Sequence, residues 1–225
     1  MSTYILHLET ATKVCSVALS LNGQLKQLKE IEEAGFTHGE NLTLLIEDAL
    51  KSEGITANQL SAVSIASGPG SYTGLRIGVS TAKGFCYALS IPLIAVDALI
   101  SIQQNAIEKY PNQNIIPMID ARRMEVFAAV YNSRGEILKP ISADILDENS
   151  YTEFEPFVAC GDGAEKLKDL WTGRAIIFAT EILSSAKGQV KLAYHKFEQK
   201  AFEDVAYFEP FYLKDFVMNV KSKAQ

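Results

Sequence analysis

Residues 67–89 read SGPGSYTGLRIGVSTAKGFCYAL, and this stretch decides how the rest of the chain is interpreted. An apolar run, AVSIA at residues 62–66, precedes it and predicts a buried strand. The three glycines that follow predict a tight turn, and the residues after them have the apolar spacing of a helix. A strand, a glycine turn and a helix in this order indicate an α/β protein.

The glycine turn resembles a phosphate-binding loop but matches no standard fingerprint. The pattern G-x-G-x-x-G fails because glycine comes one residue late, and the lysine of a Walker A loop is absent. What remains is a helix N-terminus whose amides favour an anion. The candidate phosphate or nucleotide contacts are Gly68, Gly70, Ser71, Tyr72 and Thr73. The alternative is a turn in which the glycines only satisfy backbone geometry.

The helix after this turn has an unusually wide apolar face. Its apolar and small side chains cover an arc of roughly 220°, about twice what a helix packed on one surface needs. Gly74, Gly78 and Ala82 recur every four residues within this arc, which lets another backbone approach closely. The polar strip consists of Arg76, Ser80, Lys83 and Tyr87. The second surface is either another helix of this chain or another subunit.

Residues 37–53 predict the other helix of interest. Leu42, Leu45, Ile46, Ala49 and Leu50 fall on one face at helical spacing, and packing on the chain's own sheet accounts for all five. Leu44 points roughly the opposite way, which we take as a weak indication of a partner.

The order of elements is repeated. Strand, turn, strand, Asn-Gly hairpin and strand follow one another from residue 4 to residue 31, and the same order returns from residue 115 to residue 141. Each copy continues into a strand, a glycine turn and a helix; the second does so at FVACGDGAEKLKDLW, residues 157–171. We therefore predict two similar α/β halves with mixed sheets flanked by helices, residues 1–100 and 101–225, with the boundary near residues 97–112. The last segment is expected to pack back on one half, the first being the candidate.

Composition limits the classes of partner. The formal charge of −6 comes without a basic stripe, so we expect another protein to hold most of any RNA involved. Three separated cysteines suit a reducing compartment, and neither a membrane span nor a signal peptide is evident. We expect a cytoplasmic protein.

Catalytic and metal-binding patterns are weak. The three histidines are scattered, which argues against a metal site; His7 is expected in a strand and His38 on a solvated first helical turn. Glu9 and Asp120 end the first strand of each half and are candidates to face each other across a cleft. A structural ion pair of Asp120 with Arg122 or Arg123 is the favoured alternative. We predict no catalytic residues and no metal.

Five segments of the chain resemble the TsaB (YeaZ) family. They are ILHLETATKVCSVAL at 5–19, HGENLTLLIEDAL at 38–50, SGPGSYTGLRIGVSTAKGFCYALSIPLIAVDAL at 67–99, PMIDARRMEVFAAVY at 117–131 and EPFYLKDF at 209–216. The resemblance implies the duplicated fold of the actin, Hsp70 and sugar-kinase superfamily. It also implies a part in making N6-threonylcarbamoyladenosine beside the anticodon of tRNAs.

In that system the related TsaD subunit carries the metal and transfers the threonylcarbamoyl group, and TsaE is an ATPase that joins the two. The resemblance implies a subunit with no activity or cofactor of its own, which pairs with TsaD or with itself when TsaD is absent and meets tRNA only indirectly. A nucleotide at the subunit junction stays open. The implied interface comprises Leu42, Leu45, Ile46, Ala49, Gly74, Gly78 and Ala82.

Two departures from the family pattern matter. Glu9 stands where most relatives are expected to have aspartate, and Asn41 and Leu42 stand where the catalytic relative's second metal-binding histidine would be sought. Both weaken the case for metal or nucleotide chemistry.

Two alternatives compete with the subunit hypothesis. An ATP-dependent kinase or ATPase would use the glycine turn with Glu9 and Asp120, and a peptidase would need a metal or a triad that the sequence does not offer. On the subunit hypothesis, a bulky residue at Gly78 should abolish partner binding while the fold survives.

Overall fold

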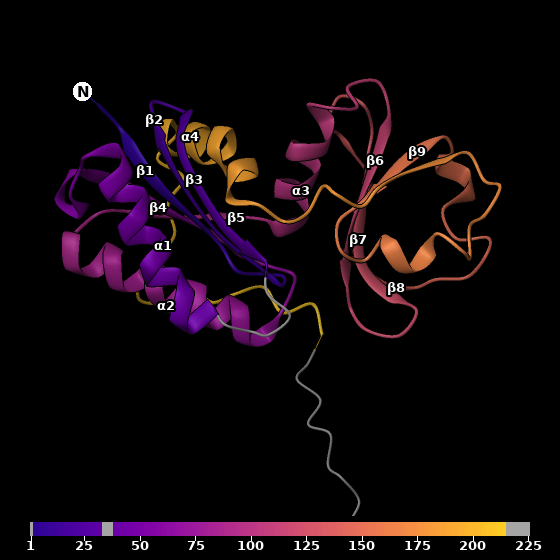
Figure 1. The fold of residues 1–225 in the computed structure, drawn as a ribbon, viewed down its shortest axis with the longest axis horizontal. Coiled ribbons are helices and arrows are strands. Elements are labelled where there is room, and N and C mark those ends of the chain that lie inside the picture. The colour runs from indigo at the N-terminus through magenta and orange to yellow at the C-terminus, as the bar shows by residue number, and fades with distance from the viewer. Residues whose placement is uncertain (1, 33–37, 215–225) are drawn as a thin grey trace, which may run out of the picture.

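The computed structural model describes residues 2–32 and 38–214, which form two five-stranded mixed sheets side by side (Figure 1). The first sheet comprises β1 (Tyr4–Glu9), β2 (Val14–Leu21), β3 (Gln24–Glu32), β4 (Leu60–Ala66) and β5 (Leu93–Val96). Asn22 and Gly23 have φ angles of 50° and 74°, the left-handed conformation that a tight β2–β3 hairpin requires. β1 pairs antiparallel with β2 and parallel with β4.

The second sheet repeats this plan. It contains β6 (Asn114–Asp120), β7 (Glu125–Tyr131), β8 (Ile137–Ile145), β9 (Phe157–Cys160) and β10 (Ile176–Ala179). The strand orders β3-β2-β1-β4-β5 and β8-β7-β6-β9-β10 correspond element by element, with the same antiparallel and parallel pairings. The predicted duplicated α/β fold is confirmed.

Two helices form a layer on one face of the first sheet (Figure 1). α1 covers His38–Glu53 and α2 covers Tyr72–Leu89, whereas Thr37 lies outside the described residues. The Ser71 hydroxyl accepts a hydrogen bond from the Gly74 amide and caps α2, which ends at Ser90 in the left-handed conformation. Between this layer and the sheet lies a core that includes Leu6, Val17, Leu42, Ile65 and Val79.

The other face of the first sheet is covered by elements from distant parts of the chain. α4 (Val190–Glu198) and the 3₁₀ helix η4 (Ala186–Gln189) pack on its strands, and α3 (Ala98–Ile107) lies between η4 and the second sheet. Asp97 caps α3 through hydrogen bonds from the Leu99 and Ile100 amides.

The second copy lacks one predicted element. Residues 161–175 form turns and a short 3₁₀ helix, η3 (Glu165–Leu167), where the sequence predicts an α-helix, so that prediction is wrong. Trp171 explains the local shape, because its indole is buried against Phe157 and Tyr151 and its Nε1 donates to the Asp147 carbonyl at 2.8 Å. In the described ranges, none of the helices is long and apolar enough to cross a bilayer.

Candidate functional site

A cleft of about 540 Å³ lies where the two sheets meet. The β1–β2 turn contributes residues 11–13, the glycine turn and the start of α2 contribute residues 70–73, and the β6–β7 turn contributes residues 120–122. Asp162 and residues 212–214 complete the lining. The corresponding turns of the two halves thus face one cleft, as the repeat in the sequence predicts.

The glycine turn packs tightly on the β1–β2 turn. The Ser71 amide donates to the Ala11 carbonyl at 2.7 Å, and a side chain at Gly70 would meet that carbonyl oxygen at 2.3 Å. Since the Gly74 amide bonds to the Ser71 hydroxyl, two of the amides at this helix N-terminus already have partners. Gly70, Ser71, Tyr72 and Thr73 line the cleft, whereas Gly68 packs under the Phe211 carbonyl. The geometry therefore favours a structural turn, and phosphate contact by these residues stays a prediction.

The three small residues of α2 face the chain's own sheet. A Cβ at Gly74 would lie 2.1 Å from the Thr10 carbonyl oxygen, and one at Gly78 would lie 2.2 Å from the Thr10 hydroxyl. Ala82 is fully buried in the same core. The contacts argue against the prediction that a bulky residue at Gly78 leaves the fold intact, because it would overlap the side chains of Thr10 and Ile65.

The apolar face of α1 is buried in the same way. Leu42, Leu45, Ile46 and Ala49 are all 8% exposed or less and belong to the core under the helix layer. Leu44 points outward, as predicted, with 62% of its surface exposed. A partner on this layer therefore meets other residues first. The exposed ones are Gly39, Glu40, Thr43, Leu44, Glu47, Asp48, Lys51, Ser52, Thr73, Arg76, Ser80, Gly84, Tyr87 and Ala88.

The chain's C-terminal segment, residues 203–214, contacts Arg76 and Lys83 of the polar strip of α2, whereas Ser80 and Tyr87 of that strip are exposed. The Lys83 ammonium donates to the Ala206 and Phe208 carbonyls, and Arg76 Nε donates to the Tyr212 hydroxyl at 3.3 Å. The segment is anchored at the glycine turn by the Phe211 amide, which donates to the Ser67 carbonyl at 2.7 Å. The second surface of α2 is thus largely this chain's own: α1 on one side and the C-terminal segment on the other.

Glu9 and Asp120 do not form a pair across the cleft. Glu9 is fully buried, accepts a hydrogen bond from the Ala11 amide and lies 3.5 Å from Gln189 Nε2. Burial raises the pKa of its carboxyl to about 7. Asp120 lines the cleft and forms an ion pair with Lys166. The expectation of an ion pair is confirmed in kind, but Lys166 replaces the arginines as the partner.

The histidines are structural. His7 is buried with Nε2 2.8 Å from the Ser20 hydroxyl, and burial lowers its pKa to about 3. His38 is also buried, with Nε2 2.7 Å from the Thr12 carbonyl, so the expectation of a solvated side chain is wrong. No group of three or more His, Cys, Asp or Glu suited to a metal ion occurs within residues 2–32 and 38–214.

The β6–β7 turn has a backbone conformation that the sequence did not predict. Arg122 and Arg123 both have positive φ angles, 71° and 50°, which are uncommon for non-glycine residues and cost about 1 kcal/mol each. The Arg122 amide donates to Asp120 Oδ1 and stabilises the turn. The two adjacent arginines in PMIDARRMEV are the available signal in the sequence, but from the sequence alone they indicate an ion pair with Asp120.

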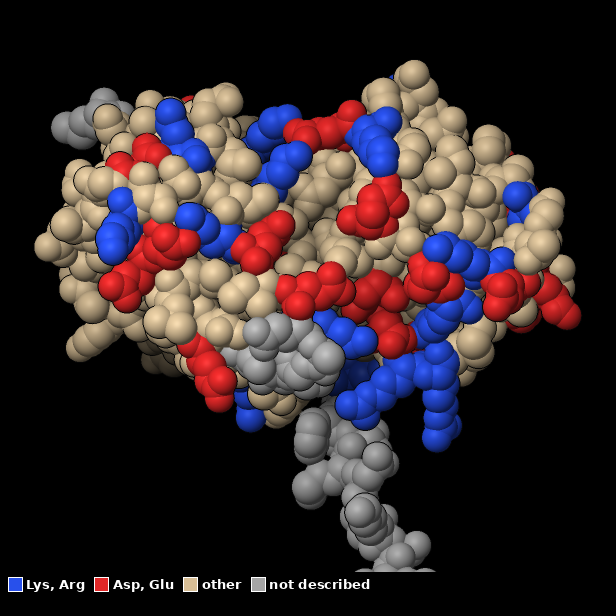
Figure 2. All heavy atoms as spheres, in the orientation of Figure 1, with Lys and Arg blue, Asp and Glu red and all other residues tan. Residues whose placement is uncertain are grey.

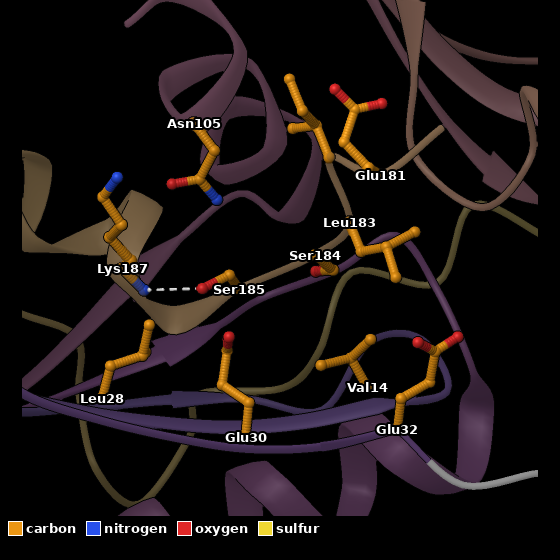
Figure 3. Close-up of a pocket in the computed structure, with 11 residues that line it drawn as sticks. Val14, Leu28, Glu30, Glu32, Asn105, Glu181, Leu183, Ser184, Ser185 and Lys187 are labelled. Atoms are coloured by element: carbon orange, nitrogen blue, oxygen red, sulfur yellow. Dashed lines mark hydrogen bonds between the residues drawn. The ribbon is translucent and has the colours of Figure 1, made fainter. Parts of the chain in front are cut away.

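A second groove, of about 450 Å³, lies between β3 and the segment before η4 (Figure 3). Glu30 and Glu32 point into it from β3, with Leu28 and Val14 on the same side. Glu181 and Lys187 line the opposite wall with their charged ends directed away from β3. Glu30 accepts a hydrogen bond from the Ser16 hydroxyl at 2.7 Å, and Glu181 pairs with Lys109. Most of its charged groups therefore already have partners.

Comparison with known proteins places this arrangement in a family. A family model described as "TsaD: tRNA N6-adenosine threonylcarbamoyltransferase" matches residues 32–221. The protein "tRNA threonylcarbamoyladenosine biosynthesis protein TsaB" of Escherichia coli is 29% identical, with 94% of each chain covered. Its namesake in Buchnera aphidicola from Acyrthosiphon pisum is 30% identical, over 76% of this chain and 74% of that protein.

A solved structure agrees with the sequence relatives. YeaZ from Pseudomonas aeruginosa superposes with a TM-score of 0.78 at 25% identity, covering 94% of this chain and all of that one. The resemblance drawn from the five sequence segments is confirmed, and the chain belongs to the TsaB (YeaZ) family, within the wider group that the TsaD model describes.

Proposed function

We propose that this chain is a non-catalytic subunit in the biosynthesis of tRNA N6-threonylcarbamoyladenosine, where it binds and supports a TsaD-type transferase. The observation that carries the proposal is the family match across nearly the whole chain. On this proposal the TsaE-type ATPase joins the pair, the chain pairs with itself when the transferase subunit is scarce, and the work takes place in the cytoplasm.

The burial and pairing of the polar groups support a non-catalytic role. Glu9 lies beneath the sheet surface, Asp120 is paired with Lys166, and both His7 and His38 bond within the core. A general base must reach its substrate within hydrogen-bond distance, and a fully buried Glu9 does not reach the cleft.

We further propose that the partner binds the outer face of the α1–α2 layer. Leu44 supplies an exposed apolar side chain there, and Gly84 has no atom within 4 Å of where its Cβ would stand, so a partner's backbone can come close. The seven contact residues predicted from the sequence hold the layer to its own sheet. The proposed contact residues are therefore their outward-facing neighbours.

Co-purification with the TsaD-type subunit of the same organism tests the proposal. Leu44→Arg should weaken that complex by tenfold or more, because a charge replaces a central apolar contact, about 1.4 kcal/mol or greater. Ile145→Arg is the matched control, since Ile145 is 81% exposed on the outer strand β8. A transferase subunit that ignores the wild-type chain would refute the function, and equal binding by both variants would refute the surface.

A stand-alone ATPase is the second candidate, favoured only by the two turns that face the cleft. It requires phosphate release by the isolated chain. The subunit proposal predicts instead that tRNA modification depends on adding the transferase subunit, and that this chain alone releases no phosphate above a no-protein blank.

A further inference from the structure

The mouth of the cleft between the sheets carries basic side chains that form no direct ion pair in the described residues, although Lys13 lies near enough to Asp162 to interact with its charge. Lys13 projects from the β1–β2 turn, and Arg122 and Arg123 project from the β6–β7 turn; all three are exposed. In the part of the chain that the structure describes, no ion pair includes any of them. The concentration is notable because the whole chain has a formal charge of −6.

The placement of these charges is built by the fold. Lys13 and Arg122 come from corresponding turns of the two halves and line the same cleft, and Arg123 follows Arg122 just outside the lining. Lys214 also lines the cleft but forms an ion pair with Glu125. Arg122 and Arg123 hold left-handed backbone conformations in succession, which directs two neighbouring side chains outward from one tight turn. Figure 2 shows Lys and Arg gathered at the lower middle of the molecule, below a band of acidic residues.

We propose that this rim, Lys13, Arg122 and Arg123, contacts the phosphate backbone of an RNA strand that crosses the mouth of the cleft. Arginine and lysine side chains on exposed turns are the usual partners of backbone phosphates. The ring of Tyr72 lines the same cleft but already contacts the Arg76 guanidinium and the Tyr212 ring, so the proposal rests on the three cations alone.

The charges inside the cleft favour a strand at its mouth over a small phosphate within it. Asp120 and Asp162 also line the cleft, and Asp162 is less exposed than the arginines. A phosphate placed inside would approach both carboxylates, whereas one at the rim meets the three cations first. Direct contact at this small rim departs from the expectation that the chain meets tRNA only indirectly, although a partner would still hold most of the RNA. The choice of tRNA as probe rests on the proposed function.

The experiment measures binding of the full chain to a fluorescent tRNA transcript over a salt series, with ATP and inorganic phosphate as separate arms. Combining Lys13→Gln, Arg122→Gln and Arg123→Gln should raise the Kd about tenfold at low salt and reduce the slope of log K against log salt by about 2. The matched control removes three exposed charges elsewhere, with Lys26→Gln, Arg134→Gln and Lys191→Gln.

The outcomes separate cleanly. A loss of affinity confined to the rim variant supports the proposal. Absence of tRNA binding by the wild type at low salt, or equal losses in both variants, overturns it. Saturable ATP or phosphate binding that the rim variant alone loses, with tRNA binding unchanged, assigns the rim to a small ligand and also overturns it. Retained co-purification of the rim variant with the transferase subunit shows that failure here leaves the proposed function standing.

Discussion

On α2, close packing rather than helix propensity determines where the fold requires a glycine. Gly78 stands against the Thr10 hydroxyl, and Gly84 stands on the same helix facing open space. The same substitution can therefore be compared at a packed glycine and at an open one on the same helix.

Gly78→Ala should destabilise the protein by about 2 kcal/mol, because the new methyl group overlaps the side chains of Thr10 and Ile65. Gly84→Ala should stabilise it by up to about 1 kcal/mol, since alanine restricts the unfolded chain and meets no atom in the fold. Urea unfolding of both variants measures the difference. Equal effects of the two changes would mean that α2 does not lie as close to β1 as the structure shows.

Glu9 makes stability depend on pH in a defined direction. Its carboxyl has an ordinary pKa of 4.5 and a folded-state pKa of about 7, so the folded chain keeps the proton that the unfolded chain releases. Stability is therefore lost as the pH rises from 4.5 to 7, by about 3 kcal/mol from this group, and the loss is complete above 7.

Glu9→Gln removes that dependence while keeping an oxygen for the Ala11 amide. The stability of the variant relative to the wild type should rise by about 3 kcal/mol between pH 4.5 and pH 8, as measured by urea unfolding at each pH. The contribution from His7 cancels in this difference, because both proteins contain it, whereas Asp97 interacts with the Glu9 charge and adds a smaller change of its own. A constant difference across the range would show that Glu9 is not the buried acid described.

At the scale of elements, the positions of helices, strands and turns follow from local sequence patterns, whereas the surfaces against which they pack depend on long-range contacts. The hairpin at Asn22-Gly23, the helix at 38–53 and the strand–glycine–helix unit at 62–89 could be predicted because neighbouring residues carry their signals. What covers each helix could not be predicted. The wide apolar arc of α2 packs on the sheet and on α1, whereas Arg76 and Lys83 of its polar strip bond to residues more than a hundred positions away in the chain.

The candidate site is likewise partly predictable from local sequence and partly determined by long-range contacts. Turns 11–13, 70–73 and 120–122 were locatable from the repeat, and they do line one cleft. The exposure of Arg122 and the burial of Glu9 depend on backbone angles and on Gln189, 180 residues away, and neither is encoded in local spacing.

Gln189 joins η4 to the first sheet through a buried polar network. Its side chain accepts from the Ser64 hydroxyl at 2.7 Å and donates to the Leu8 carbonyl at 2.9 Å. Gln189→Leu should cost about 3 kcal/mol, because these groups are left buried without partners. Ser64→Ala should cost less in the Gln189→Leu background than alone. Additive effects in this double-mutant cycle, measured by urea unfolding, would contradict a shared network.

At the scale of the whole molecule, the two sheets differ in which parts of the chain cover their faces. The strands of the second sheet and the helix α3 that packs on it are continuous in sequence, from residue 98 to residue 179. The first sheet is closed only by segments from the other end of the chain: η4 and α4 on one face, and residues 203–214 beside α2 on the other. His7, Ser16, Ser64 and Ile94 would otherwise be exposed to water on the face under η4 and α4.

This asymmetry predicts different behaviour of two fragments. Residues 97–182 should unfold cooperatively in urea, because they contain their own core around Trp171 and under α3. Residues 1–97 should not, because one face of their sheet lacks its cover. Joining residues 183–214 to the first fragment through a flexible linker should restore a cooperative transition, which circular dichroism would record. A cooperative transition in residues 1–97 alone would show that the C-terminal segments decorate the first half without completing it, and the buried network at Gln189 would then be expected to contribute little to stability.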